Sequence, residues 1–389
     1  MHSKATLSRM TPDLLIVGAG PTGCVVAERA AQLHGWKSVV IDRRPHIAGN
    51  CFDQYHSSGI LIHRYGPHYF RTNDSDLVTY LSNFTKWIPS NYIVKSSVGG
   101  ELLPFPINLT TLEKVFKRTL TAEEAQNLLG DLKIPISNPS NSEDYVLARV
   151  GLQLFRDFYE GYTEKQWGVH PRELPPEICG RIPIRMSRDE RYVDHQYQMM
   201  PAKGYASLFE RMLAHENIEL RLNVDYSQFR NLVAPRIGTI YCGPIDEFFN
   251  FQLGKLDWRS LDFEFQEFDQ PFKQPCVQIN YPSVRVPYTR SVEFKHVTGQ
   301  QHAKTVVALE YPRAAGEPYY PVSTARNEGL YARYEKLARE QSAANQAPVY
   351  FCGRQGTYRY MNMDECMLSA MKMVEKIESD FMRRTQCSN

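Results

Sequence analysis

A glycine-rich turn between two apolar runs constrains the fold of this chain more than any other feature. The segment from Leu14 to Asp42 reads LLIVGAGPTGCVVAERAAQLHGWKSVVID. Short apolar runs indicate buried strands, and the spacing of the apolar residues between them indicates a helix. The segment therefore predicts a strand, a helix and a second strand, at 13–18, 21–33 and 37–42. Such a β-α-β unit implies a parallel sheet, so we expect an α/β fold with a Rossmann-like unit.

Three glycines, Gly18, Gly20 and Gly23, follow the first strand with the spacing G-x-G-x-x-G. The first glycine permits a tight turn, the second lets the backbone approach a pyrophosphate, and the third lets the helix pack close to the strand. The free N–H groups and the dipole at the start of the helix also favour phosphate. Asp42 ends the second strand, where an acid can accept hydrogen bonds from a ribose. The unit therefore predicts a dinucleotide site.

Length and charge exclude several classes of protein. A chain of 389 residues is too long for one ordinary domain, and 42% hydrophobic residues provide a sizeable core. Its 45 basic and 43 acidic residues nearly cancel, so the overall charge favours neither nucleic acid nor an anionic membrane as a partner. The sequence contains no apolar run of about 18 residues, so we expect no membrane span.

The cysteines and the N-terminal segment indicate a cytoplasmic protein. The eight cysteines are scattered without a C-x-x-C pair, and several lie in apolar runs. We therefore expect free buried thiols, with no disulfide framework and no metal site. Residues 1–13 lack the apolar stretch of a secretory signal.

The choice of dinucleotide depends on the residues after Asp42 and on the C-terminal region. An acid at Asp42 disfavours the 2′-phosphate of NADP and leaves FAD and NAD. The stretch RRPHIAGN that follows contains Arg43 and Gly49 in a basic turn, which favours FAD. Near the C-terminus, VYFCGRQGTYRYMNMD repeats the order of strand, glycine turn and helix, with Arg354 in the turn and a helix starting near Asn362. Arg354 and the helix dipole can then face a pyrophosphate or an isoalloxazine ring.

Helical and strand patterns divide the rest of the chain. Helices are predicted at 74–84, 110–118, 121–130, 143–162 and 362–382. Strands are predicted at 59–70, where the strand leads into a glycine turn, and at 218–222, 239–243, 277–281, 290–296, 304–312 and 349–353. We predict three domains. Residues 1–75, 205–250 and 345–389 form an FAD-binding domain, and residues 76–165 form a mostly helical substrate-side domain. Residues 166–204 and 251–344 form a mixed or antiparallel sheet domain.

Several longer motifs are more specific than the glycine turn. After VGAGPTG they are, in chain order, HRYGPHYFRTN, PFPINL, GYTEKQWG, GRIPIRMSRDERYVDHQYQMMPAKGYASLFERML, IYCGPIDEFF, YTRSVEFKH, EPYYPV and GRQGTYRYMNMD. In these motifs and in their order, the chain resembles the UDP-galactopyranose mutases of the bacterial type. The resemblance covers essentially the whole chain.

The resemblance implies an activity and a cofactor. Members of this family interconvert the pyranose and furanose rings of a nucleotide sugar without net redox change, and they require reduced FAD. The family chemistry implies a covalent adduct between flavin N5 and the sugar. For this chain it implies conversion of UDP-galactopyranose to UDP-galactofuranose for cell-surface polysaccharide. NAD(P)H or another reductant would act transiently, and a homodimer is left open.

The resemblance also implies roles for individual residues. Arg181, on a segment similar to the family's mobile loop, and Arg290, on a strand, match the arginines that bind the substrate diphosphate. His68 matches a histidine beside the flavin, and these three are the expected catalytic residues. The expected substrate-binding residues are Trp167, Tyr162, Tyr192, Tyr320, Tyr360, Asn362 and Arg71. The expected cofactor-binding residues are Gly18, Gly20, Gly23, Asp42, Arg43, Gly49, Asn50, His68, Arg354, Asn362 and Met363.

Three positions depart from the family pattern. Arg71 stands where the family usually has a second histidine, and Pro104 where it usually has glutamine. Asn362 stands where many members have aspartate, although asparagine also occurs there. The first two lie on segments that border the family's sugar and flavin pocket. Because the flavin site and both arginines are retained, these departures bear on the identity of the sugar rather than on the chemistry.

Three other functions stay open from the sequence. The first is a mutase for an N-acetylated or 6-deoxy galactose nucleotide, which Arg71 and Pro104 would allow. The second is a flavin-dependent oxidoreductase of the amine-oxidase-like class, which would share the first motif but has no need of the arginine pair or of GYTEKQWG. The third is a flavin-binding or sugar-nucleotide-sensing protein without catalysis.

Overall fold

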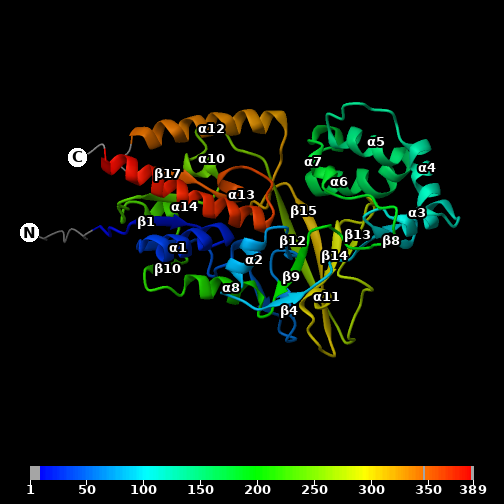
Figure 1. Ribbon diagram of the computed structural model, residues 1–389, viewed down its shortest axis with the longest axis horizontal. Coiled ribbons are helices and arrows are strands. Elements are labelled where there is room, and N and C mark those ends of the chain that lie inside the picture. Colours follow the sequence, from blue (N-terminus) through cyan, green and yellow to red (C-terminus); the bar gives the residue numbers. More distant parts are fainter. Residues whose placement is uncertain (1–8, 345–346, 387–389) are drawn as a thin grey trace, which may run out of the picture.

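The computed structural model describes residues 9–344 and 347–386. The expected free thiol of Cys387 and residues 1–8 of the N-terminal segment lie outside these ranges. Within them, a unit built on a parallel sheet and a helical unit are connected by a second, larger sheet (Figure 1).

Five parallel strands form the sheet that the glycine motif predicts. In sheet order they are β10 (Ile218–Leu222), β2 (Ser38–Asp42), β1 (Leu14–Val17), β11 (Gly238–Tyr241) and β17 (Val349–Phe351). The helix α1 (Pro21–His34) connects β1 to β2; it begins with Pro21 and ends at Gly35 in a left-handed conformation. Proline suits the start of a helix because its missing N–H has no partner there anyway. The β-α-β unit and its Rossmann-like fold are confirmed.

Two helices pack on α1 and complete the core of this unit (Figure 1). They are α8 (Gly204–Leu213) and the long α14 (Met363–Gln386). Ala370, Val374 and Ile377 of α14 are fully or almost fully buried in the core that α1 also enters. As a result, the start of α14 lies beside the glycine turn, as the repeated C-terminal motif predicts.

The larger sheet has seven strands and is mostly antiparallel, as predicted. In sheet order they are β16 (Tyr320–Pro321), β12 (Trp258–Phe268), β15 (Thr305–Arg313), β14 (Arg290–Glu293), β13 (Gln278–Asn280), β7 (Val94–Val98) and β8 (Glu101–Phe105). Only the pair of β13 and β7 is parallel. This sheet brings segments from distant parts of the chain next to one another.

The helical unit follows β8 in the chain. Its members are α3 (Leu109–Phe116), α4 (Ala122–Leu132), α5 (Ser142–Leu154), the π-helix η2 (Phe155–Glu160), α6 (Gly161–Trp167) and α7 (Glu177–Gly180). Side chains of Asn108, Thr121 and Asn141 accept hydrogen bonds from backbone N–H groups at the starts of α3, α4 and α5. These caps satisfy donors that a helix start otherwise leaves free.

Smaller elements connect these units. Two small sheets contain β3 (Asp53–Tyr55) with β4 (Leu61–His63), and β5 (Phe70–Thr72) with β9 (Tyr197–Pro201) and β6 (Trp87–Pro89). The remaining helices are α2 (Ser75–Leu81), α9 (Tyr226–Phe229), α10 (Ile245–Phe248), α11 (Lys295–Thr298), α12 (Ala325–Ala344) and α13 (Gly353–Gly356), with short turns η1 (Gly49–Cys51) and η3 (Pro171–Glu173). No helix in the described ranges combines the length and apolar character needed to cross a bilayer.

The predicted domain boundaries need three corrections. β7 and β8 lie within 76–165, predicted to be mostly helical, yet they pair into the seven-stranded sheet. α6 and α7 reach into the range 166–204, predicted for the sheet domain, but they pack on η2 and α5. α12, predicted for the same domain, packs on α10 of the parallel-sheet unit through Leu330 and Tyr334. Its few apolar positions gave no clear helical pattern in the sequence.

Three predicted elements also end at other residues. The strand predicted at 59–70 is shorter: β4 ends at His63, the expected glycine turn lies at Gly66, whose φ is 86°, and β5 begins at Phe70. The strand at 290–296 ends at Glu293, where α11 follows. The helix at 143–162 is interrupted at Gly151, whose φ of 79° is not helical, and continues as a π-helix before α6.

Candidate functional site

A large cavity lies beside the glycine turn, with an empty volume of about 1350 Å³. We call it the glycine-turn cavity. It contacts the ends of β1, β2, β11 and β17, and the starts of α1 and α14. It contains nearly all of the predicted cofactor-binding residues, namely Gly18, Gly20, Gly23, Asp42, Arg43, Gly49, Asn50, His68, Arg354 and Met363. Asn362, also predicted to bind the cofactor, is not among its lining residues.

Two glycines of this cavity have no space for a side chain. A Cβ added to Gly23 would lie 1.9 Å from the backbone oxygen of Gly18. A Cβ added to Gly49, whose φ is 54°, would lie 2.9 Å from Cα of Gly20. The backbone segments at Gly20 and Gly49 are therefore in close contact. Because glycine has no side chain, neither residue covers the start of α1.

Asp42 connects the glycine turn to the turn after β2. Its carboxylate accepts hydrogen bonds from the backbone N–H of Ala19 over 2.8 Å and of Arg44 over 2.9 Å. A carboxylate has about four acceptor positions, so two bonds leave capacity for a hydroxyl group. Arg43 forms ion pairs with Glu247 and Glu317, at 3.3 and 2.9 Å. These pairs hold its charge at the edge of the cavity.

A second cavity adjoins the first, with an empty volume of about 950 Å³. We call it the arginine cavity because Arg71, Arg181, Arg290 and Arg354 all line it, whereas no Asp or Glu of the described residues does. The two cavities share His68, Arg354 and Met363. All predicted substrate-binding residues line it, namely Trp167, Tyr162, Tyr192, Tyr320, Tyr360, Asn362 and Arg71.

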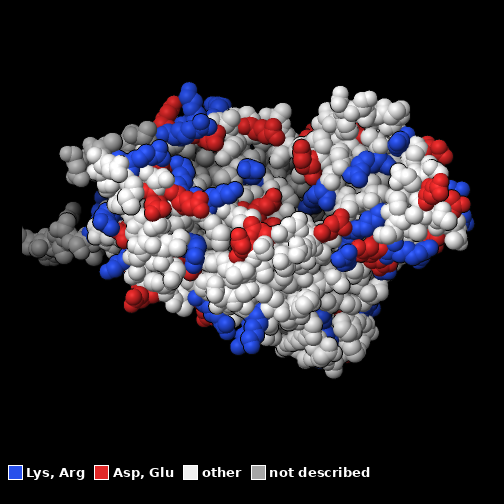
Figure 2. Space-filling model, viewed as in Figure 1, with Lys and Arg blue, Asp and Glu red and all other residues white. Residues whose placement is uncertain are grey.

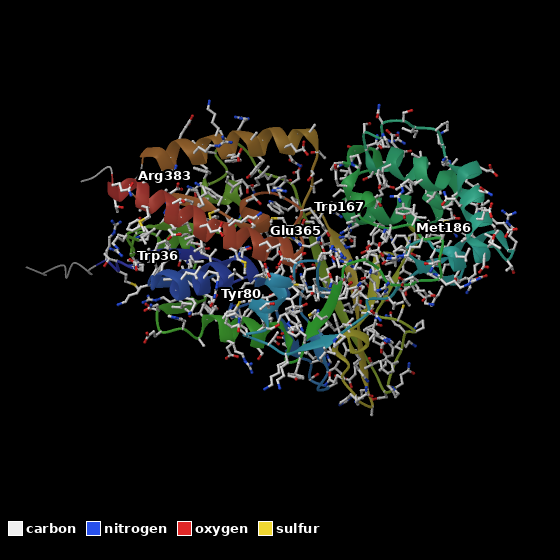
Figure 3. All side chains as sticks on the ribbon, viewed as in Figure 1. Trp36, Tyr80, Trp167, Met186, Glu365 and Arg383 are labelled. Carbon is white, nitrogen blue, oxygen red and sulfur yellow. The ribbon has the colours of Figure 1, made fainter. Side chains whose placement is uncertain are left out.

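The positive charge of this cavity is local. On the face drawn in Figure 2, basic and acidic residues are interspersed and form no broad patch of one sign. Trp167, at the end of α6, lies where the helical unit meets the rest of the protein (Figure 3). The arginines are thus brought together by the meeting of different elements, and their charges favour an anionic ligand in this cavity.

Arg181 and Arg290 enter the cavity from opposite parts of the fold. Arg181 follows α7, is exposed, and donates hydrogen bonds to the carbonyl of Ile178 and to the hydroxyl of Tyr360. Arg290 begins β14 and donates from Nε to Oε2 of Glu310 over 2.5 Å and from Nη2 to the hydroxyl of Tyr320 over 3.3 Å. Each arginine is thereby oriented next to a tyrosine hydroxyl.

Three aromatic side chains form one wall between these arginines. The ring centroids of Trp167, Tyr320 and Tyr360 lie 5.9 to 6.0 Å from one another. The guanidinium of Arg354 lies 5.5 Å from the ring centroid of Tyr320 and 5.4 Å from that of Tyr360. Arg354 also donates to the backbone carbonyls of Met361 and Tyr319.

The arginines change the acidity of Tyr360. Burial acts to raise the pKa of its hydroxyl, but Arg181, Arg354, Arg71 and Arg290 outweigh burial, so the pKa lies below the usual value. Nearby positive charge favours the ionised form of an acid in this way. The hydroxyl of Tyr360 is therefore a better hydrogen-bond donor than that of an ordinary tyrosine.

His68 lies at the boundary of the two cavities. Its Nδ1 is 2.9 Å from the carbonyl oxygen of Gly66, and its backbone N–H donates to Nδ1 of His63 over 3.0 Å. Burial lowers the pKa of His68 to about 4, and the charges of Arg354 and Arg290 act in the same direction. His68 is therefore neutral near pH 7.

Several lining residues were not predicted from the sequence. In the arginine cavity these are Pro67, Tyr69, Tyr92, Gln166 and Gln278, and in the glycine-turn cavity they include the segment 224–227 and the turn 241–244. Gln166 lies within GYTEKQWG and could have been found from that motif. Tyr92 and Gln278 are connected by a hydrogen bond of 2.7 Å but belong to no distinctive motif.

Comparisons with known families agree with this geometry. The family model described as UDP-galactopyranose mutase matches residues 157–360, and the one described as NAD(P)-binding Rossmann-like domain matches residues 16–84. A probable UDP-galactopyranose mutase of Klebsiella pneumoniae is 35% identical, over 94% of this chain and 95% of the relative. A dTDP-fucopyranose mutase of Escherichia coli is 34% identical, over 93% of this chain and 97% of the relative.

Solved structures show the same fold at low sequence identity. A crystal structure of reduced UDP-galactopyranose mutase has a TM-score of 0.76 at 16% identity, covering 95% of this chain and 96% of the other. A putative protoporphyrinogen oxidase from Exiguobacterium has a TM-score of 0.64, also at 16% identity, covering 96% of this chain and 100% of the other. The fold is thus shared with oxidases, whereas the family match and the relatives over nearly the full length show that this chain belongs to the UDP-galactopyranose mutase family.

Proposed function

We propose that this protein interconverts the pyranose and furanose forms of a nucleotide sugar, with reduced FAD as its cofactor. The observation that carries the proposal is that the glycine-turn cavity and the arginine cavity adjoin and share His68, Arg354 and Met363. A dinucleotide in the first cavity would meet a phosphorylated substrate in the second at these residues. UDP-galactopyranose is the proposed substrate because several relatives are named for it.

The residues of the glycine-turn cavity fit FAD. The close contact of Gly20 and Gly49 keeps the N–H groups at the start of α1 open to a pyrophosphate, and Asp42 has acceptor capacity for a ribose. Arg354 stands at the boundary where the flavin end would lie. When bound and reduced by NAD(P)H or another reductant, FAD supplies a nucleophilic N5 to the anomeric carbon.

Arg181 and Arg290 are proposed to bind the substrate diphosphate. Bonds from guanidinium to phosphate are charge-assisted and fork-shaped, so two arginines can orient both phosphates. One carboxylate, Glu310, neutralises part of the charge of Arg290, and the cavity lining still carries an excess of positive charge. This excess suits a substrate with two negative charges and a leaving group that must be held during ring opening.

The tyrosines and His68 supply polar groups without further charge. Tyr320 and Tyr360 have hydroxyls already oriented by Arg290 and Arg181, so they can bond phosphate or sugar oxygens without rearrangement. His68, neutral at pH 7, directs its Nδ1–H to the carbonyl of Gly66, so its Nε2 can accept a hydrogen bond next to the cofactor without adding charge. Tyr162 and Tyr192 line the same cavity.

A mutase for a different sugar is the second candidate. Arg71 donates from Nη2 to Oδ1 of Asn362 over 2.9 Å, so two of the departures from the family pattern contact each other in the arginine cavity. The dTDP-fucopyranose mutase relative, at 34% identity, acts on a 6-deoxy sugar by its name. Pro104, the third departure, is not among the lining residues of either cavity.

One experiment tests the proposal against both alternatives. The FAD-loaded protein is reduced with dithionite and incubated with UDP-galactose, UDP-N-acetylgalactosamine and dTDP-fucose, and furanose products are measured by NMR. Furanose formed from UDP-galactose supports the proposed substrate, and furanose formed only from another sugar supports the second candidate. In a separate aerobic reaction of the oxidised protein, hydrogen peroxide that accumulates with one of these sugars in place of any furanose product would indicate an oxidase.

A further inference from the structure

The ammonium group of Lys165 lies among four backbone carbonyls of a single loop. Nζ is 2.6 Å from the carbonyl oxygen of Tyr281, 2.9 Å from those of Ser283 and Val286, and 3.0 Å from that of Tyr288. These residues belong to the connection between β13 and β14. Within the described ranges, Lys165 is in no salt bridge.

The convergence of four carbonyls requires a cation. Carbonyl dipoles that point at one position repel one another, and an ammonium with three N–H donors compensates for that repulsion. Within this connection the backbone contributes few bonds of its own, such as that from Val286 N–H to Ser283 O. The conformation of the 281–288 loop therefore depends on the side chain of Lys165 more than on backbone pairing.

The loop leads directly to Arg290. The backbone N–H of Tyr281 donates to Thr289 O over 2.8 Å and closes the loop, and Asn280 and Arg290 are paired in register. Any shift of the loop would be transmitted to the first residue of β14. That residue is Arg290, which lines the arginine cavity.

The helix that carries Lys165 also carries a cavity residue. α6 ends with Trp167, two positions after Lys165. Thr289 donates from its hydroxyl to Oε1 of Gln166 over 3.2 Å, and a Cβ added to Gly161 would lie 2.4 Å from Pro282 O. α6 and the 281–288 loop are therefore in close contact along the length of the helix, and Lys165 supplies the only charged group among these contacts in the described ranges.

We propose that Lys165 is a positioning residue: by holding the 281–288 loop on α6, it fixes Arg290 relative to Trp167 across the arginine cavity. The proposal rests on the proposed function insofar as Arg290 binds the substrate diphosphate. Lys165 lines neither cavity, and its ammonium group is bonded to backbone carbonyls. Its loss is nevertheless expected to lower nucleotide affinity, because it positions Arg290.

The chain contains a matched control for the chemistry of Lys165. Lys295 is 3% exposed, and its Nζ donates to the carbonyls of Pro271, His302 and Lys304 over 2.8, 2.5 and 3.0 Å. It therefore also holds a loop through backbone carbonyls. Like Lys165 it lines neither cavity, but it follows the far end of β14 at Glu293, and none of the carbonyls that it holds lies in the segment 281–290 that leads to Arg290. Loss of each lysine should lower stability, and only the loss of Lys165 should lower nucleotide affinity.

The experiment uses the full-length, FAD-loaded protein with the variants Lys165→Met, Lys165→Arg and Lys295→Met. FAD content, UDP affinity by calorimetry, and amide hydrogen exchange of the segment 281–290 are measured for each. Lys165→Met should retain FAD, exchange faster in that segment, and bind UDP about 10- to 100-fold more weakly. Lys165→Arg keeps a multiple donor and should recover part of the affinity. Lys295→Met should leave both the exchange of 281–290 and the UDP affinity as in the wild type.

Two kinds of failure can be distinguished. Wild-type UDP affinity in Lys165→Met, or weakened affinity without faster exchange in 281–290, overturns the positioning role of Lys165 alone. If Lys165→Met does not accumulate as folded protein, Lys165→Arg decides by the same two measurements. A wild-type protein that does not bind UDP overturns the proposed function and the role of Lys165 with it.

Discussion

Arg290 and Glu310 form a buried ion pair, with Nε of the arginine 2.5 Å from Oε2 of the glutamate and Glu310 fully buried. Burial raises the pKa of Glu310, and the charge of Arg290 opposes that rise. The pair fixes one edge of the guanidinium on β15, so its other edge is directed toward Tyr320. Arg290 therefore has a carboxylate partner, whereas Arg181 is in no salt bridge within the described ranges.

This difference predicts two distinguishable variants. Arg290→Ala and Arg181→Ala should each lose about 2–5 kcal/mol of substrate interaction, or roughly 30- to several-thousand-fold in kcat/KM, while retaining FAD. Arg290→Ala should also lower the stability by about 3–5 kcal/mol, because Glu310 is left buried without its partner. Activity assays combined with thermal unfolding test this; equal Tm values for the two variants would contradict the structural part.

Substitution of lysine tests the geometry of the arginines separately from their charge. Lysine retains the positive charge but lacks the planar fork. Arg290→Lys should restore most of the stability that Arg290→Ala loses, because Glu310 regains a cation. It should restore only part of kcat/KM. Full recovery of activity by Arg290→Lys would show that a point charge is sufficient at this position.

Arg71 should influence the choice of sugar. Its bond to Asn362 places a permanent charge in the arginine cavity, at the position where the family usually has histidine. Arg71→His should shift the preference among nucleotide sugars toward UDP-galactose and leave FAD binding unchanged. The ratio of kcat/KM values for UDP-galactose, UDP-N-acetylgalactosamine and dTDP-fucose measures this. An unchanged ratio would mean that Arg71 only supports Asn362.

The parts of the site that were predictable from the sequence are those encoded locally. The glycine turn, β1 and α1 follow from one continuous pattern, and the distinctive motifs located the arginines and tyrosines. The ion pair of Arg43 and Glu317 was not predictable, because it joins residues 274 positions apart. Likewise β8 was missed because Pro104 interrupts its apolar run, although its edge position in the sheet tolerates a proline.

Glycine packing predicts a clear difference between two alanine variants. Gly23→Ala would place Cβ 1.9 Å from Gly18 O and should abolish FAD binding by displacing α1 from the turn. Gly130→Ala, in the exposed part of α4, meets no atom within 4 Å and should stabilise the protein by about 0.5–1 kcal/mol. Absorbance of bound flavin and thermal unfolding measure the two effects. Normal FAD content in Gly23→Ala would contradict the assigned role of the glycine turn.

Two buried histidines predict a loss of stability in mild acid. Burial lowers the pKa of His63 to about 3 and that of His68 to about 4, whereas an unfolded histidine has a pKa of about 6.5. Between these values the unfolded chain binds more protons, so the free energy of unfolding falls as the pH falls from about 6.5 toward about 4.

The variant His63→Phe isolates this effect. It removes one of the two groups, so its Tm should decrease less steeply than that of the wild type between about pH 7 and pH 5. Burial raises the pKa of Asp53 to about 6, which acts in the opposite direction but equally in both proteins. Parallel Tm curves for the two proteins would show that His63 does not titrate differently on unfolding.

The most direct test of the account compares one preparation in two redox states. The protein loaded with FAD is divided, one half is reduced with dithionite under anaerobic conditions, and both halves receive UDP-galactopyranose. We predict that only the reduced protein forms UDP-galactofuranose, detected by NMR, through many turnovers and without stoichiometric consumption of the reductant. Equal activity of the oxidised half, or one equivalent of reductant consumed for each product, would contradict the proposed function.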